Sequence, residues 1–496
     1  IFFRSHCDTM GSVKMDRTSI CALLAIMGGS IFGYVLIGIS SAALTIWRCY
    51  YGLAARNEEN QWWIGALFAV INVGGLPYGL VAGNVMEAFG RKKTVTMGGA
   101  VIFVGTLLSS VAPVYTAQAC ARVLTGVGVG MIMSSVPVYI AEMAPANRRG
   151  TLQALFQVCV TLQILSGNVA GYYILGPHRD LLPCDYCPKH TGTDIVFKNA
   201  ILLAPGMVLA LCVCIVGATI MPESEAWSGY VAPEGEKEED DVDEGSALTG
   251  NRKVDYGEMG NQPKSPADAV PEIPRSLLGL LKCPQSLMAA YMMAVAQQAT
   301  GINAVMFYAP KFLALGGVQL KMLGSVAVMF WNFVTTLLAM FLVDKVGRRT
   351  LLLPSMFAMA ISLLSMGPIY AGIHAGYVSS IWCFVPLFVF VTGFEVGPGT
   401  LFGVILNEVF PEQVLPFGAP IVGTSSGIFA LITTVIFPPL ELRLGTGVFG
   451  IFGVITTIVW VYLLICLPET RGLTRREVTQ KVTGPSWVHF GDKGKE

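Results

Sequence analysis

Charged side chains are scarce in this sequence. Asp, Glu, Lys and Arg together make up 13% of its 496 residues, and histidine occurs only five times. So little charge excludes a water-soluble protein of this length. The 32 basic residues equal the 32 acidic ones in number, so the formal net charge is zero. This balance gives no indication of a nucleic acid as a partner.

Motifs of enzyme chemistry are also missing from the sequence. It contains no nucleophile with an adjacent base, no phosphate-binding loop and no metal-spaced cluster of ligating side chains. We therefore expect a protein that is not an enzyme, with no catalytic residues, no cofactor and no bound metal.

Apolar side chains are abundant instead. Hydrophobic residues make up 53% of the chain, and the mean hydropathy is +0.62. A helix of about 20 apolar residues crosses the hydrocarbon core of a bilayer, and such runs recur about twelve times here. They predict an all-α membrane protein surrounded by lipid. The expected spans start near Ser19, Trp62, Thr94, Thr116, Thr151, Ala200, Leu287, Met322, Thr350, Ile381, Pro416 and Val448.

Two short motifs occur once in each half of the chain. Gly90-Arg91-Lys92 lies between spans of the first half, and Gly347-Arg348-Arg349 lies between spans of the second. Each half also ends on a matching tripeptide, Pro222-Glu223-Ser224 or Pro468-Glu469-Thr470. The repetition predicts two pseudo-symmetric six-helix bundles, with a solute pathway between two rocking halves. We expect bundles over 19–221 and 285–470, a linker over 222–284, and terminal segments over 1–18 and 471–496.

Basic residues gather on one side of the expected spans. If the spans alternate in direction, the basic residues that follow the second, fourth, eighth and twelfth spans all fall on the same side. The positive-inside rule assigns that side to the cytoplasm. Both termini and the linker are then cytoplasmic as well, in a multi-pass protein that we expect in the plasma membrane.

The expected linker differs in composition from the spans. An acidic run extends from Glu234 to Glu244, and no apolar periodicity is present. Such a segment cannot bury enough apolar surface to offset the entropy cost of ordering it. We expect a largely disordered linker and favour that interpretation over an acidic partner-binding motif.

Most of the 12 cysteines lie within spans, where they are expected to be small buried apolar residues. Cys184 and Cys187 differ, because they lie in the outward loop after the fifth span. There they could join each other or another loop cysteine such as Cys49. A zinc site with His178 and His190 is the less favoured alternative.

Acidic and basic residues recur together at the ends of spans that face the predicted cytoplasm. The positive-inside rule alone would explain a single basic cluster. The repetition of basic residues beside matching acidic ones favours ion-paired clasps between helices. We hypothesise that these clasps hold the two halves together on the cytoplasmic side. The candidates are Glu87, Arg91, Lys92, Glu142, Arg148, Arg149, Asp344, Arg348, Arg349 and Glu408.

Four motifs in family order resemble those of the sugar porters of the major facilitator superfamily. They are Pro137-Val138-Tyr139-Ile140-Ala141-Glu142 with Arg148-Arg149-Gly150, Arg122 with Gly126, Gly128 and Gly130, Gln297-Gln298-Ala299-Thr300-Gly301-Ile302-Asn303, and Pro468-Glu469-Thr470-Arg471-Gly472. The resemblance runs from the first span to Thr474. It implies the major facilitator fold, in which twelve transmembrane helices form two bundles, and a monosaccharide as the small-molecule partner.

The resemblance also implies a set of sugar-binding side chains. Amide groups both donate and accept hydrogen bonds without carrying charge, as sugar hydroxyls require. For Asn332 alone, a hydrogen bond between helices is an equally supported alternative. The implied substrate-binding residues are Gln157, Gln297, Gln298, Asn303, Asn332 and Glu395. Ile164, Phe307, Tyr308, Phe394, Gly403 and Gly427 are expected at the pocket or its gate, although packing is the commoner role of aromatic residues in spans. Arg122, like Glu395, places a charge inside a span, which is typical of a functional interior.

The chain departs from the family pattern in several places. Proton-coupled members have an acidic residue where Val35 follows Phe32-Gly33-Tyr34, so a facilitative uniporter is favoured, with Glu395 as a substitute proton site in the alternative. Gly403 and Gly427 replace two tryptophans, which predicts a wider or differently shaped pocket. Leu415, Glu225 and Ala226 stand where clasp partners are usual, so some clasps are expected to be missing or rerouted.

These observations predict transport of a hexose such as glucose by alternating access, most simply as facilitated diffusion. A proton-coupled symporter of a sugar or of a polyol such as inositol is the alternative. A sugar sensor that does not transport is less favoured, since the tail after Thr474 has only about twenty residues and such sensors signal through long tails.

Overall fold

The computed structural model describes residues 16–53, 58–145, 148–176, 193–224, 227, 277–315, 317–343, 345–411 and 414–467. The linker's acidic run, Cys184, Cys187, His178 and His190 lie outside these residues. Cys49 is disulfide-bonded. The domain boundaries expected from the sequence therefore stay predictions.

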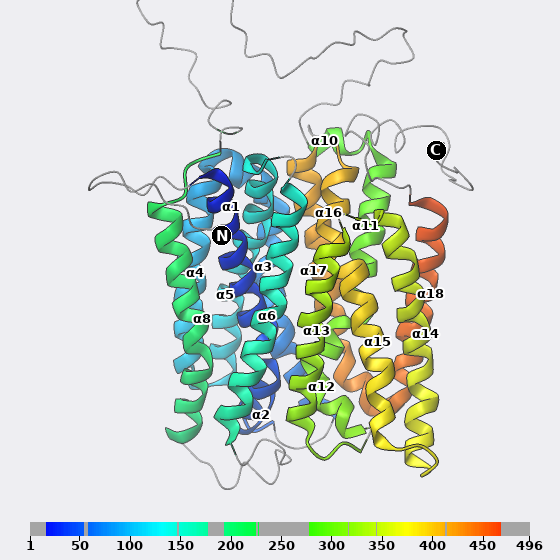
Figure 1. Ribbon diagram of the computed structural model, residues 1–496. Helices are drawn as coiled ribbons and strands as arrows, with labels where there is room; N and C mark the ends of the chain where they lie inside the picture. Colours follow the sequence, from blue (N-terminus) through cyan, green and yellow to red (C-terminus); the bar gives the residue numbers. More distant parts are fainter. Residues whose placement is uncertain are drawn as a thin grey trace, which may run out of the picture.

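Six spans form the first half of the molecule (Figure 1). The first span begins as α1 (Arg17–Phe32) and continues through the π-helical turn η1 (Gly33–Gly38) into α2 (Ser40–Tyr50). The other five are α3 (Glu58–Phe89), α4 (Arg91–Val111), α5 (Tyr115–Met143), α6 (Arg149–Leu175) and α8 (Thr193–Thr219).

The second half follows the short helix α10 (Leu277–Leu280). Its first span is divided into α11 (Pro284–Gln298) and α12 (Ile302–Leu315), and its fourth into α15 (Phe384–Phe394), the π-helical turn η6 (Glu395–Gly399) and α16 (Thr400–Val409). The remaining spans are α13 (Lys321–Val343), α14 (Arg348–His374), α17 (Leu415–Leu444) and α18 (Val448–Cys466).

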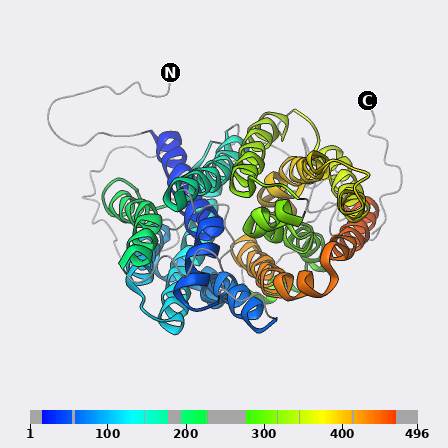
Figure 2. The same cartoon turned by 90° about the horizontal axis from the view of Figure 1, so that it is seen from below.

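The predicted fold class is confirmed: the described spans form two six-helix bundles. Figure 2 shows the two bundles side by side, with the first half in blue to green and the second in light green to orange. Among the described residues, ten helical stretches are long and apolar enough to cross a membrane, and one of them contains both α17 and α18. The span that is divided into α11 and α12 is not one of these stretches, because each of its two helices is too short by itself.

Three helix pairs make most of the contact between the halves. α17 packs along α3, α13 packs along α6, and α12 packs against α2. Since α3 ends at Phe89 and α4 begins at Arg91, the charged motif of the first half lies at one end of the bundle, at the top of Figure 1. α2 and α12 lie at the opposite end of the molecule. The helix pairs that join the halves enclose the space between the two ends.

Candidate functional site

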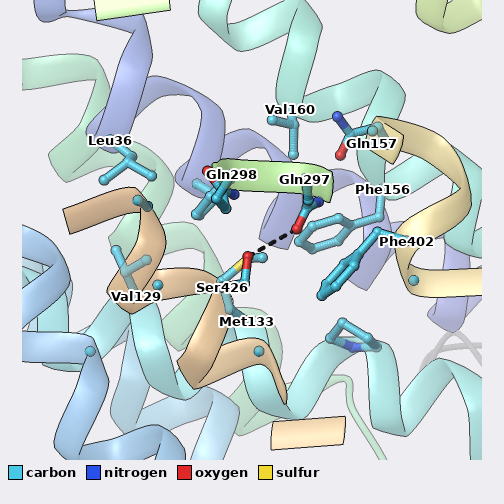
Figure 3. Close-up of a pocket in the computed structure, with 18 of the residues that line it drawn as sticks. Leu36, Val129, Met133, Phe156, Gln157, Val160, Gln297, Gln298, Phe402 and Ser426 are labelled. Carbon is cyan, nitrogen blue, oxygen red and sulfur yellow. Dashed lines mark hydrogen bonds between the residues drawn. The ribbon is translucent and has the colours of Figure 1, made fainter. Parts of the chain in front are cut away.

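A cavity of about 320 Å³ lies between the two halves. From the first half it is lined by α1, η1, α3, α5 and α6, and from the second by α11, α12, α13, α15, η6, α16 and α17. Figure 3 shows part of its lining, where Gln297 of α11 lies near Phe156 of α6 and is hydrogen-bonded to Ser426 of α17. A cavity of this size is within the range of small-molecule sites.

The side chains predicted to bind substrate all line this cavity: Gln157, Gln297, Gln298, Asn303, Asn332 and Glu395. So do most of the predicted pocket residues, namely Ile164, Phe307, Phe394, Gly403 and Gly427. Tyr308 does not line it and packs behind Phe307. The roles of these residues in binding stay predictions, but their convergence from two halves of the chain is an observation.

The amide cluster is built on the interruption between α11 and α12. Gly301 has a φ of 89°, a conformation that residues with a side chain rarely adopt, and the chain turns there between the two helices. The interruption places Gln298 at the end of one helix and Asn303 near the start of the next. Asn303 Nδ2 donates to Gln298 Oε1 (2.6 Å), and Ser426 Oγ donates to Gln297 Oε1 (3.1 Å). The amides are thus oriented before a ligand enters.

Glu395 carries a carboxylate at the wall of the cavity and is only 2% exposed. It begins the π-helical turn η6, in which Gly397 departs from helical geometry and Pro398 has no N–H. Gln157 Nε2 donates to Glu395 Oε2 (3.4 Å), which is the long end of the hydrogen-bond range. This contact links the two halves across the cavity.

Asn332 is fully buried on α13, and its amide interacts with the Glu395 carboxylate of η6. Neither amide atom has a hydrogen bond of ordinary length among the described residues, so this contact between helices is a weak one. A ligand hydroxyl at this wall of the cavity would find the amide able to bond to it. Both interpretations of Asn332, a contact between helices and a ligand contact, stay predictions.

Several polar residues at the cavity escaped sequence reasoning. Gln153 precedes Gln157 by four residues and so shares its face of α6, and its Nε2 is buried without a partner among the described residues. That spacing could have identified Gln153 as a cavity residue. No comparable pattern marks Asn72, Ser134 and Ser426, because isolated small polar residues in spans commonly bond to their own helix.

Aromatic rings close the cavity at the end where α2 and α12 lie, which we call the aromatic end. Phe68 of α3 stacks on Phe307 of α12 with ring centroids 5.9 Å apart. Tyr308 stacks on Phe437 of α17 at 5.2 Å, and its hydroxyl donates to the Thr434 carbonyl (3.5 Å). Phe68, Phe307 and Tyr308 are each at most 1% exposed. These rings, contributed by both halves, form the aromatic closure.

At the opposite end, which we call the clasp end, an ion-pair cluster joins helices of the first half. Arg91 donates from Nη2 and Nε to the Glu142 carboxylate (2.7 and 3.1 Å) and from Nη2 to Glu87 (3.3 Å). Glu223 accepts from the backbone N–H of Arg91 (2.8 Å), and the Ser224 hydroxyl donates to Glu142. The Glu223 carboxylate thus satisfies free N–H groups at the N-terminus of α4.

The second half repeats this arrangement. Arg348 donates from Nη2 and Nε to Glu408 (2.7 and 3.2 Å) and from Nη1 to the Val343 carbonyl five residues earlier, as Arg91 does to Met86. The three ion pairs named here each join helices of one half. The hypothesis that the clasps also hold the two halves together stays a prediction.

The other predicted clasp residues behave differently. Arg148 is exposed and does not pair with Glu142 as expected, whereas Arg349 donates to the Leu464 carbonyl (2.6 Å). Lys92 contributes its backbone N–H to Glu223 (3.2 Å). Asp344, Glu225, Ala226 and the side chain of Arg149 lie outside the description. Leu415 is buried in an apolar cluster. Glu223 and Ser224 of the matching tripeptide take part in the first-half cluster, and the expectation of missing or rerouted clasps at Glu225 and Ala226 stays a prediction.

The two glycines at the cavity differ in the space around them. A Cβ at Gly403 would have no neighbour within 4 Å, whereas one at Gly427 would lie 3.2 Å from a Leu76 methyl group, which is closer than ordinary van der Waals contact. A wider or differently shaped pocket stays a prediction. Val35, where an acidic residue was looked for, is buried. Among the described residues no group of His, Cys, Asp and Glu is arranged to hold a metal ion.

The sequence matches the family model described as sugar (and other) transporter over residues 21–481. It is 27% identical to polyol transporter 5 of Arabidopsis thaliana, over 96% of this chain and 88% of the relative. It is 28% identical to the glucose transporter GlcP of Staphylococcus epidermidis, over 92% and 95%, and 27% identical to facilitated glucose transporter member 3 of Ovis aries, over 98% and 97%.

The fold is similar to that of XylE, a major facilitator superfamily proton:xylose symporter whose structure was solved with 6-bromo-6-deoxy-D-glucose. The TM-score is 0.70 at 20% sequence identity, over 93% of this chain and 98% of that one. At this identity the similarity establishes the major facilitator fold and no more.

Proposed function

The chain belongs to the sugar transporter family, and we propose that it carries a hexose through the central cavity by alternating access, driven only by the sugar gradient. As a member of this family it is an integral membrane transporter and not an enzyme. The observation that carries the proposal is the convergence of amide side chains from both halves on one cavity. Substrate bound there contacts both bundles, so that rocking of the bundles exposes it first on one side and then on the other.

The chemistry of the lining supports a polyhydroxylated, uncharged substrate. Gln157, Gln297, Gln298 and Asn303 offer both donors and acceptors. Leu36, Val129, Val160 and other apolar side chains line the first half's wall (Figure 3). A pyranose ring matches such a site, because its hydroxyl groups need hydrogen bonds while its C–H faces pack on apolar walls.

The cavity is asymmetric along the bundle axis, which supports one access state. Its lining extends toward the clasp end as far as Ile140 and Leu406, each two residues from a clasp glutamate, whereas Phe68 and Phe307 shut it at the aromatic end. We place the clasp end in the cytoplasm by the positive-inside rule. The conformation is then inward-facing, with both termini cytoplasmic in the plasma membrane.

A proton-coupled carrier of a sugar or polyol is the second candidate. Glu395 favours it, because a carboxylate buried at a cavity wall without an ion-paired cation among the described residues is a possible proton carrier. Relatives named polyol transporter 5 and D-xylose-proton symporter-like 2 are similar to this chain at 27% identity. Val35 favours the uniporter, since valine cannot exchange a proton.

Counterflow in proteoliposomes tests both candidates. We expect labelled hexose to accumulate against an excess of unlabelled hexose inside, at two pH values and equally with a protonophore present. Gln298→Ala should lose most of this uptake while eluting as a folded protein, and Gln319→Ala, an exposed amide outside the cavity, should keep it. Net uptake that collapses with the protonophore would establish the symporter, and counterflow restricted to polyols would replace the hexose.

A further inference from the structure

A continuous row of ring contacts leads from the interior of the first half to the aromatic closure. Trp47 of α2 lies against Phe68 with ring centroids 5.2 Å apart, and Phe68 stacks on Phe307 of the other half. Trp47 does not line the cavity and is fully buried. It therefore forms a backing for Phe68 on the side away from the closure.

Three helices of the first half fix the Trp47 ring. Its indole N–H donates to Asn199 Oδ1 of α8 (2.9 Å), and Asn199 Nδ2 in turn donates to the carbonyl groups of Ser109 and Ser110 in the last turn of α4. The Arg122 guanidinium of α5 lies over the ring at 5.0 Å from its centroid. The indole is held at its edge by one contact and on its face by another.

Arg122 is an unusual residue to hold a ring. It is 2% exposed, no described carboxylate pairs with it, and its Nε and Nη2 have no hydrogen-bond partner among the described residues. A buried arginine without an acid is costly in a membrane protein. The Trp47 face is the one favourable contact that the described residues give its charge, and cation–π attraction is strongest when the pair is desolvated.

The other side of the closure is built to move. Phe307 and Tyr308 lie on a short helical segment that starts after the interruption at Gly301, and Tyr308 itself has non-helical angles (φ −117°, ψ 20°) just before Pro310. A segment bounded by two such breaks can pivot, whereas Phe68 belongs to the continuous helix α3. The closure thus forms when a movable aromatic segment meets a fixed one.

We propose that Arg122 is a positioning residue for the aromatic closure: its guanidinium holds the Trp47 ring against Phe68, and this contact sets how firmly the pathway is shut at that end. The proposal rests on the proposed alternating access, but it concerns the balance between access states and not sugar recognition. The proposal gives a conformational role to the Arg122 guanidinium, which does not line the cavity and does not pair with a described carboxylate.

Thiol labelling at Asn72 tests the proposal without any sugar. Asn72 lines the cavity one turn beyond Phe68 on α3, so Asn72→Cys reports passage of a membrane-impermeant maleimide through the closure. From the aromatic end, Arg122→Gln should raise the labelling rate about five- to thirty-fold. Arg122→Lys, which keeps a cation, should stay close to the parent. The parent without Asn72→Cys gives the background from native cysteines.

A double-mutant comparison separates positioning from a general loss of packing. In a Trp47→Leu background the Arg122→Gln change should have no further effect on labelling, because the ring through which it acts is gone. Lys198→Gln removes a cation of the same half that pairs with Asp194, and it should label like the parent. Trp47→Phe keeps a ring and provides a milder partner if Trp47→Leu folds poorly.

Two results would overturn the proposal: parental labelling in Arg122→Gln, or an equal effect of that change with and without Trp47. Because no substrate is involved, either result leaves hexose counterflow untouched as a separate question. If the protein does not transport hexose but shows the expected labelling, the positioning role of Arg122 is supported and the proposed substrate is wrong.

Discussion

Asn332 is a side chain at which binding and stability can be separated. Its buried amide lies at the cavity wall beside the Glu395 carboxylate, with no hydrogen bond of ordinary length among the described residues. Replacing it by leucine, of similar shape, removes a poorly bonded buried amide, which is costly, together with a weak contact to Glu395, which is favourable. We expect Asn332→Leu to leave the thermal unfolding midpoint close to that of the parent while raising the KM for hexose counterflow about tenfold or more.

The matched change Gln319→Leu acts on an exposed amide and should alter neither quantity. If Asn332→Leu lowered the unfolding midpoint, the contact of the amide with Glu395 would be a stabilising hydrogen bond between helices. If KM were unchanged, Asn332 would not bind the sugar.

Gly301 is the residue on which the amide cluster depends. Its φ of 89° disfavours a side chain, and a Cβ would lie 2.9 Å from the Phe452 ring. Gly301→Ala should destabilise the protein by about 1–3 kcal/mol and reduce counterflow, because Gln298 and Asn303 would separate. Gly450→Ala is the control: its Cβ would meet nothing within 4 Å and it lies inside α18, so no loss is expected. Thermal unfolding and counterflow measure both.

The family resemblance implied a set of side chains that share one cavity, and the structure brings them together there. Their amides agree with such a place, because an amide inside an apolar span is costly unless it finds a partner. Gln153 was missed although its spacing from Gln157 places both on one helix face. Ser426 could not be found, since nothing in the local sequence shows that its hydroxyl reaches Gln297 on a helix 129 positions away.

At the scale of helices, the starts of the spans were predictable and their interruptions were not. Thr116 and Val448 lie within one residue of the observed starts of α5 and α18, because long apolar runs bounded by polar residues mark such boundaries. The turns η1 and η6 were not predicted. Their sequences, Gly33–Gly38 and Glu395–Gly399, contain glycine, as many regular membrane helices do, and packing between helices decides whether the helix widens there.

The clasps are equivalent in sequence but unequal in burial, and this predicts unequal contributions to stability. The Arg91 side chain is 2% exposed and that of Arg348 is 14% exposed. Removing one partner of a buried pair costs about 3–5 kcal/mol, whereas exposed pairs contribute about 0–1 kcal/mol. We expect Arg91→Ala to lower the free energy of unfolding by about 3 kcal/mol, and Arg348→Ala by less.

Thermal unfolding in detergent provides the comparison, with the exposed Lys345→Ala as the control. Because the Arg91 and Arg348 ion pairs named above each join helices of one half, neither variant should change the ratio of the two access states by more than about threefold, as reported by labelling of Asn72→Cys. A large change in that ratio with unchanged stability would favour the hypothesis that the clasps hold the halves together.

At the scale of the whole molecule, the aromatic closure requires the halves to approach closely at one end. Gly65 of α3 lies one turn before Phe68, and a Cβ there would be 3.0 Å from the Val435 carbonyl of α17. A larger side chain must push the two helices apart. We expect Gly65→Leu to slow counterflow at least about tenfold, and to speed labelling of Asn72→Cys from the aromatic end.

The size of the two effects in Gly65→Leu distinguishes rocking of halves from a local gate. If the halves move as rigid bodies, a wedge between α3 and α17 keeps the whole aromatic end apart, and Phe307 cannot reach Phe68 however freely its segment pivots. If the segment after Gly301 moved alone, it would still close over a displaced α3, and counterflow would stay near the parental rate. Gly367→Leu, on a helix of the second half with no neighbour closer than 3.9 Å, controls for the added bulk. Slow counterflow in Gly65→Leu alone would therefore place the moving unit at the level of the bundle.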